Sequence, residues 1–266
     1  MGSGATEIMD ERPSVAVITG AAGDIGRAIA AALLDADHNV VLADINLGAA
    51  EAAAAAMGGR ASAVACDITD PASVERMARA AEALGPVAVL VNNAGGITSA
   101  SLQSTGIGEW RRDTALNLDG AMLCFRALEG ALKATRGTVV NIASVNGFGV
   151  FGHPGYSVAK AALLHLTRLI AVEYGRFGIR ANAVAPGTVM TQAWNARASA
   201  NPRIVDEVKR WYPLDRLAEP ADVAAAVRFL SGPGARAITG ICLPVDCGLT
   251  AGQVDLARTF SQSPDY

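Results

Sequence analysis

Short apolar runs alternate along this chain with longer segments in which apolar residues recur at helical spacing. The short runs are rich in valine, isoleucine, alanine and leucine, which predicts strands covered on both faces. Because nearly every gap between them has a helical pattern, parallel strands joined by crossover helices are expected. We therefore predict an α/β fold with a doubly wound, parallel seven-stranded sheet and helices on both faces. The strands are expected at about 14–19, 39–44, 61–66, 87–92, 137–143, 180–185 and 237–245.

The pattern fits a single domain. A length of 266 residues with 51% apolar and 18% charged residues suits one large core. We place the catalytic domain at 13–251, with a flexible segment at 1–12 and a tail at 252–266.

Composition also narrows the partners and the compartment. With 22 basic and 25 acidic residues, a net charge of −3 and no basic block, nucleic acid is not an expected partner. The four cysteines lack C-x-x-C spacing and there are three histidines, so no metal site is expected. The sequence has neither the apolar stretch of a signal peptide nor a membrane-spanning run. We expect a cytoplasmic enzyme with no membrane partner.

A glycine-rich turn follows the first predicted strand and opens an alanine-rich helix. Such glycines let the backbone approach a pyrophosphate, and the free N–H groups at the helix start favour its negative charge. The strand before the turn and the helix after it meet the conditions for a dinucleotide-binding turn in a Rossmann-like sheet. The residues of the turn are Gly20, Gly23, Asp24, Ile25 and Gly26.

Asp44 closes the second predicted strand, 18 residues beyond Gly26. A carboxylate there accepts hydrogen bonds from the adenosine ribose hydroxyls and repels a 2′-phosphate. Neither Ile45 nor Gly23 supplies a cation for such a phosphate, so NAD is favoured over NADP. The alternative is an aspartate that merely begins a turn.

Tyr156 and Lys160 are four residues apart, which puts them on one face of a helix, and Ser144 lies twelve residues before the tyrosine. A tyrosine normally titrates near pH 10, so it is a poor base at neutral pH unless a nearby cation stabilises the phenolate. We expect Lys160 to lower the pKa of Tyr156 in this way. Ser144, at the end of a strand, would bind the same substrate oxygen.

These motifs together resemble, over nearly the whole chain, those of a single-domain, NAD-dependent short-chain dehydrogenase/reductase. The resemblance implies a catalytic tetrad of Asn117, Ser144, Tyr156 and Lys160, in which Asn117 joins a water to Lys160 as a proton relay. The family usually has glycine at the position of Asp24. We expect Asp24 to be a helix N-cap whose side chain faces away from the phosphates.

The resemblance also extends the expected cofactor site. Asp67 and Ile68 would contact the adenine, although Asp67 as a helix cap before Pro71 is the alternative. The segment 92–95 would hold the sheet end open beneath the cofactor, and Thr188 would bind the nicotinamide carboxamide with help from Thr191. The full set of expected cofactor contacts is Gly20, Gly23, Asp24, Ile25, Gly26, Asp44, Asp67, Ile68, Asn93, Ala94, Gly95, Tyr156, Lys160, Pro186, Gly187, Thr188, Val189 and Thr191.

Substrate contacts are expected from loops above the sheet. Asn146 and His153 lie between Ser144 and Tyr156, and Trp194 lies in the segment 189–212, which we predict to be a substrate lid. A packed surface helix is the other interpretation of that segment.

Two helices, predicted at 110–132 and 156–174, carry more apolar residues than one sheet face covers. Burial against symmetry mates would account for them, so a homotetramer is expected, with a dimer as the alternative.

The function predicted is hydride transfer between NAD and a secondary alcohol or ketone, with Tyr156 as general base or acid. The substrate class stays open among a polyol, a sugar, a cyclic alcohol and a hydroxy acid. The alternatives are an NADPH-dependent 3-ketoacyl carrier-protein reductase and a catalytically silent NAD-binding sensor or scaffold.

Overall fold

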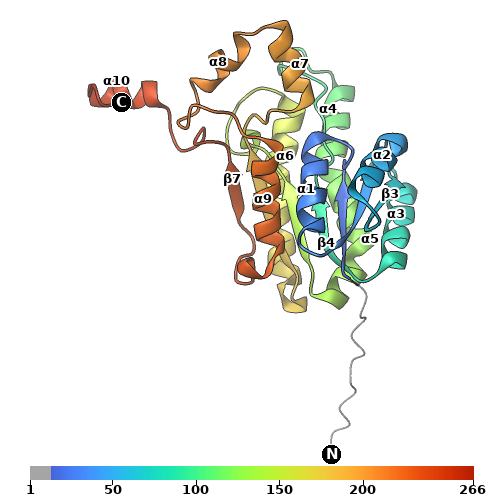
Figure 1. The fold of residues 1–266 in the computed structure, drawn as a ribbon. Helices are drawn as coiled ribbons and strands as arrows, with labels where there is room; N and C mark the ends of the chain where they lie inside the picture. Colours follow the sequence, from blue (N-terminus) through green and yellow to red (C-terminus); the bar gives the residue numbers. More distant parts are fainter. Residues whose placement is uncertain (1–12) are drawn as a thin grey trace, which may run out of the picture.

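The computed structural model describes residues 13–266, and its centre is one parallel sheet of seven strands (Figure 1). The strand order is β3-β2-β1-β4-β5-β6-β7, so the chain winds outward in both directions from β1 and β4. This confirms the predicted doubly wound sheet. The predicted flexible segment 1–12 lies outside the described residues. The strands are β1 (Val15–Thr19), β2 (Asn39–Asp44), β3 (Ala61–Ala65), β4 (Val87–Asn92), β5 (Thr138–Ile142), β6 (Arg180–Pro186) and β7 (Cys242–Val245).

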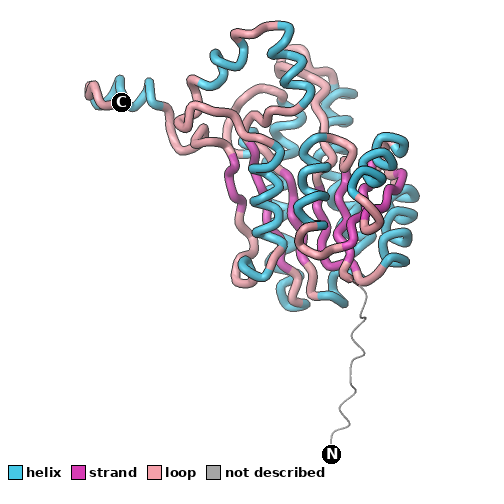
Figure 2. The backbone as a smooth tube through the Cα atoms, in the orientation of Figure 1, coloured by secondary structure: helices cyan, strands magenta, loops and turns pink. Residues whose placement is uncertain are grey.

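Helices cover both faces of this sheet, as the tube in Figure 2 shows. The core on one face includes side chains of α1, α2 and α9, and the core on the other includes side chains of α3, α5 and α6. None of the helices within residues 13–266 is long and apolar enough to cross a membrane. The helices are α1 (Asp24–Leu34), α2 (Leu47–Met57), α3 (Pro71–Leu84), α4 (Ile107–Thr114), α5 (Gly120–Thr135), α6 (Pro154–Tyr174), α7 (Gln192–Ala200), α8 (Ile204–Lys209), α9 (Pro220–Ser231) and α10 (Val254–Ser261).

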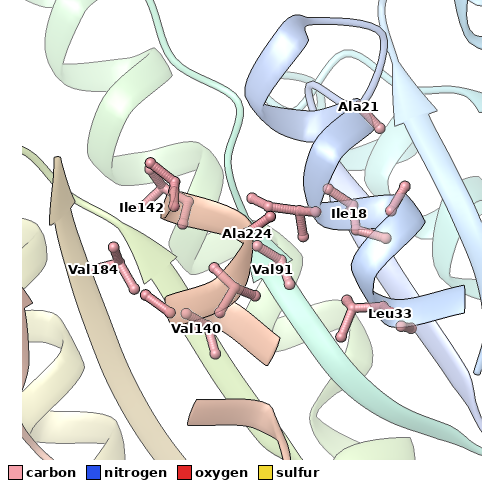
Figure 3. Close-up of a cluster of buried hydrophobic side chains, with 14 of the residues drawn as sticks. Ile18, Ala21, Leu33, Val91, Val140, Ile142, Val184 and Ala224 are labelled. Carbon is pink, nitrogen blue, oxygen red and sulfur yellow. The ribbon is translucent and has the colours of Figure 1, made fainter. Parts of the chain in front are cut away.

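The central strands are mostly apolar because they are buried on both faces. In β1, Ala16 and Ile18 belong to one core and Val15 and Val17 to the other, as the two-residue period of a strand requires. In the first core, Ile18 and its neighbours on β4, β5 and β6 gather with Leu33 of α1 and Ala224 of α9 (Figure 3).

Two predicted elements differ from the structure. The last strand begins at Cys242 rather than 237, because a turn in which the Ile238 N–H donates to the Ala235 carbonyl precedes it, and Gly240 has φ of +77°. The helix predicted at 110–132 is α4 and α5 joined by a π-helical turn, Ala115–Asp119. Such a turn is frequent at functional sites.

The core on the α5 side provides a test of packing. Phe125 is fully buried, and its ring meets the Tyr174 ring edge-on with the centroids 4.8 Å apart. We expect Phe125→Ala to lower the free energy of unfolding by about 3–5 kcal/mol, since it leaves a cavity that its neighbours fill only partly. Denaturant unfolding measures this loss. Phe229→Ala, at a ring that is 48% exposed, is the control, and an equal loss there would contradict the assignment of Phe125 to the core.

Candidate active site

Most of the predicted cofactor residues meet at one edge of the sheet. The carboxyl ends of parallel strands share an edge, and the helix N-termini that follow them point to it. A hollow of about 580 Å³ lies there. It is lined by Gly20, Gly23, Asp24, Ile25, Gly26, Asp44, Ile45, Cys66, Asp67, Ile68, Asn93, Ala94, Gly95, Leu116, Thr191 and Ala193. A second hollow, of about 660 Å³, lies between α1 and α9 and includes none of the predicted site residues.

The glycine turn is held tightly against the end of β4. Gly20 has φ of +63°, and a Cβ atom there would lie 2.7 Å from the Ala94 Cα. The Thr19 hydroxyl oxygen accepts from the backbone N–H groups of Asn93 and Ala94, at 3.1 and 3.0 Å. The Asn93 side chain donates in return to the carbonyls of Thr19 and Gly20, at 2.9 and 3.0 Å. Glycine is therefore required at position 20 by both conformation and space.

Asp24 does not cap its own helix, so that prediction is wrong. Gly23, with extended backbone, is the N-cap of α1, and Asp24 is already the first helical residue. Its carboxylate accepts from Arg27 Nη2 at 2.6 Å and from the backbone N–H of Gln192 at 2.7 Å. No local sequence pattern indicates the second contact, because the two residues are 168 positions apart.

The two other acids at this edge are held by local hydrogen bonds. One Asp44 oxygen accepts from the Ala22 N–H and the other from the Asn46 N–H, both at 2.9 Å. Asp67 accepts from the backbone and the hydroxyl of Thr69. The alternative of Asp67 as a helix cap is wrong, since Asp70 caps α3 by accepting from its first backbone N–H groups.

Tyr156 and Lys160 lie on the first turns of α6, and Ser144 lies two residues beyond the end of β5 on the same edge. The Ser144 side chain lies close enough to Tyr156 to influence its pKa. Lys160 Nζ lies 5.5 Å from the centre of the Tyr156 ring and donates to the Ile142 carbonyl at 2.7 Å. The structure thus brings Ser144, Tyr156 and Lys160 together, the three side chains whose spacing in the sequence predicts acid–base chemistry.

The electrostatics differ from the expectation. Burial raises the pKa of Tyr156, and the neighbouring Ser144 side chain opposes this only in part. Burial also lowers the pKa of Lys160 from 10.5 to about 8. In the protein without a ligand the pKa of Tyr156 therefore lies above its ordinary value, because removal of the charge from water outweighs the groups that favour the phenolate.

Asn117 lies in the π-helical turn, where its side chain faces the loop after β4. It donates to the carbonyls of Gly96 and Asp113, at 2.8 and 2.9 Å, and accepts from the Gly96 N–H at 3.2 Å. A Cβ atom on Gly95 would lie 2.7 Å from Asn117 Oδ1 and 3.5 Å from Lys160 Nζ. Asn117 and Lys160 therefore approach each other at Gly95.

Pro186 ends β6, and the segment after it is hydrogen-bonded to the far end of the segment 189–212, the predicted lid. The Tyr212 hydroxyl accepts from the Thr188 N–H and donates to the Thr188 hydroxyl, both at 2.9 Å. Val189 forms an isolated bridge with Ala218. Tyr212 was not singled out from the sequence, although a buried tyrosine at a loop end often has such a partner.

The three predicted substrate contacts, Asn146, His153 and Trp194, have different partners in the structure. Asn146 donates from its backbone to the Ser144 hydroxyl and from its side chain to Ser157, so it positions the serine. His153, at φ of +57°, forms a ring hydrogen bond of 2.8 Å with the Ser99 carbonyl. Trp194 lies on α7 beneath the Arg197 guanidinium, 5.3 Å from the ring centre, and is not among the residues that line the hollow.

Comparison with known proteins agrees with this geometry. A family model described as enoyl-(acyl carrier protein) reductase matches residues 20–250. The chain is 40% identical to meso-2,3-butanediol dehydrogenase of Serratia marcescens, over 89% of this chain and 94% of that protein. It is 41% identical to cis-4-hydroxycyclohexanecarboxylate dehydrogenase of Sinomonas cyclohexanicum, over 89% and 96%. A solved short-chain dehydrogenase/reductase family oxidoreductase from Burkholderia thailandensis superposes with a TM-score of 0.89 at 43% identity, covering 96% of this chain and 99% of that one.

The fold and these comparisons define the class of protein, an α/β oxidoreductase with a Rossmann-like sheet. The chain belongs to the short-chain dehydrogenase/reductase family.

The buried lysine yields a prediction that does not depend on substrate. Below pH 8 Lys160 is protonated in both the folded and the unfolded state, and the full cost of burying its charge is present. Between about 8 and 10.5 the unfolded state binds more protons, so the stability contributed at this site rises with pH.

As the pH rises from 7 to 9.5, the free energy of unfolding of the wild type should therefore rise by about 2 kcal/mol relative to that of Lys160→Met, which buries no charge at this position. Urea unfolding of both proteins at the two pH values measures the difference, and Lys209→Met, on the lid, is the control. A difference that does not change with pH would contradict the buried, charged state of Lys160.

Proposed function

We propose that the protein is an NAD-dependent dehydrogenase of small secondary alcohols, with Tyr156 as the general base in oxidation and the general acid in reduction. One observation carries the proposal: Tyr156, with Ser144 and Lys160 beside it, stands at the same sheet edge as the glycine turn and Asp44. The prediction that the enzyme is cytoplasmic stays a prediction.

The cofactor site fits a dinucleotide with a free ribose 2′-hydroxyl. A Cβ atom at Gly20 or Gly26 would collide with the backbone of the protein itself, at 2.7 and 2.5 Å, so this tight turn forms only because both residues lack one. Asp44 borders the hollow, and Ile45 beside it is 75% exposed and supplies no cation for a phosphate. This supports NAD over NADP.

In the proposed mechanism, bound NAD supplies the hydride acceptor. Tyr156 takes the proton of the substrate hydroxyl, and Ser144 donates to the same oxygen, held in place by Asn146. Lys160 binds the nicotinamide ribose, and Asn117 maintains the proton path from Lys160 toward solvent. Burial favours the neutral phenol of Tyr156, so the cofactor-free protein is set to donate a proton, and alcohol oxidation requires its loss.

The substrate is proposed to be a small polyol or cyclic alcohol. The relatives named as butanediol and hydroxycyclohexanecarboxylate dehydrogenases support this class. The description of the matching family model favours a second candidate, a carrier-protein reductase, which among our alternatives is the NADPH-dependent 3-ketoacyl type. A panel of alcohols with NAD and NADP, and of ketoacyl thioesters with NADH and NADPH, followed by the absorbance of the reduced cofactor, separates the two.

We also propose that α5 and α6 form the contact between subunits of a homotetramer. Side chains on the outer faces of these helices stay exposed in the single chain, with Val172 at 82%, Val158 at 49% and Met122 at 40%. Burial of these faces against symmetry mates would remove apolar surface from water.

Asp44 tests the choice of cofactor. We expect Asp44→Ala to raise the Kd for NAD about tenfold or more, because hydrogen bonds from the ribose hydroxyls to a charged acceptor contribute roughly 1.5–3 kcal/mol. The difference between the Kd values for NAD and NADP should become smaller at the same time. Titration calorimetry with both cofactors measures this, and Asp37→Ala, at an exposed acid on the opposite end of β2, is the control. Equal wild-type efficiency with NAD and NADP would overturn the assignment.

Tyr156 tests the chemistry. Tyr156→Phe keeps the ring and removes the ionisable oxygen, so kcat should fall by roughly 10²–10⁴ while the Kd for NAD changes little. Steady-state kinetics on the best substrate of the panel measures the loss. Tyr266→Phe, at an exposed tyrosine, is the control. Near-normal turnover of Tyr156→Phe would rule out the mechanism.

A further inference from the structure

The Asp24 carboxylate joins two parts of the chain that both line the hollow of the predicted dinucleotide site. Its Oδ2 accepts from the backbone N–H of Gln192, at 2.7 Å. Asp24 lines the hollow, and so do Thr191 and Ala193 on either side of Gln192. In Figure 1 the first lid helix, α7, lies above the upper end of α1. The contact therefore lies at the wall of the hollow.

Helix α7 needs a cap that its own sequence does not provide. Its N-cap residue, Thr191, is extended, with φ of −97° and ψ of 171°, and makes no side-chain hydrogen bond to the helix. The first N–H groups of a helix have no intrahelical partner, and a carboxylate beside them is favoured by both hydrogen bonding and the helix dipole. Asp24 accepts from the first of these groups. It is free to do so because Gly23 is the N-cap of α1.

No side chain of α7 is buried. Helix α8 after it has no fully buried residue either, although Val205 and Val208 pack against the core. A segment with few buried apolar contacts opens easily, so a single charge-assisted hydrogen bond has a large share in its position.

Arg27 offsets the negative charge of Asp24. Its guanidinium pairs with Asp24 Oδ1 at 2.6 Å, one turn along the same helix. A bare carboxylate next to a pyrophosphate would repel it, and the paired cation offsets that charge. The two oxygens of Asp24 thus have separate partners: Oδ1 pairs with the Arg27 guanidinium, and Oδ2 accepts from the Gln192 N–H at the start of α7.

We propose that Asp24 is a positioning residue that holds the lid, residues 189–212, over the dinucleotide hollow by capping α7 from the opposite side. Arg27 neutralises the carboxylate so that it does not repel the cofactor. The capping of α7 is independent of what the hollow binds, whereas the effect on cofactor retention rests on the proposed function.

Hydrogen exchange of the cofactor-free protein tests the capping. Asp24→Ala should speed amide exchange in residues 192–200 about fivefold, the factor that corresponds to loss of a cap of about 1 kcal/mol. Asp24→Asn keeps an acceptor oxygen and should stay close to the wild type. Asp35→Ala, at an exposed acid at the other end of α1, is the control, and exchange in α3 reports whether each variant is folded.

The rate of NAD release tests whether the capping of α7 by Asp24 helps to retain the cofactor. Stopped-flow displacement should show NAD leaving Asp24→Ala several times faster than the wild type. Arg27→Met should bind NAD more weakly, and Asp24→Asn in that background should restore binding.

Unchanged exchange in residues 192–200 of Asp24→Ala would overturn the proposal. Slower NAD release from Asp24→Ala would overturn it as well, because the carboxylate would then act only by repelling the cofactor. If the wild type binds no NAD, the proposed function fails, and the exchange experiment still decides whether Asp24 caps the lid.

Discussion

The structure depends on the close approach of the turn after β1 to the end of β4. Thr19 and Asn93 exchange hydrogen bonds across it, and Gly20 leaves no room for a Cβ against Ala94. Because Gly95, next along the chain, contacts Asn117 and approaches Lys160, this one junction positions both the lining of the hollow and the candidate catalytic side chains. A shift of the turn would move the cofactor site and the candidate chemistry together.

Burial is the dominant influence on the candidate catalytic groups. It raises the pKa of Tyr156 and lowers that of Lys160, so both charged forms are disfavoured in the protein without a ligand. The Ile142 carbonyl compensates the lysine with a hydrogen bond. A site of this kind excludes water and strengthens the interactions within it, at a cost in stability that the surrounding core offsets.

The predicted lid, residues 189–212, is held differently, because its ends and α8 reach the core through Val189, Tyr212, Val205 and Val208, whereas α7 has no buried residue. Tyr212 bonds Thr188 at one end, Asp24 bonds Gln192 at the other, and the helices between them have no buried residue. A rigid sheet edge and a lightly held lid suit a site that must admit and release a large ligand.

The sequence by itself determined the sheet, because runs such as Val15–Thr19 are apolar on both faces and only a doubly covered strand buries them. The spacing of Tyr156 and Lys160 likewise needed only the helical repeat. Tertiary structure decided what depends on distant partners. Asp24 finds Gln192 across 168 residues, Asp70 rather than Asp67 caps α3, and the balance of burial against attraction sets the Tyr156 pKa. Local sequence patterns indicate which face of a helix or strand a residue occupies. Only the tertiary fold determines which hydrogen-bond donors lie beside a carboxylate.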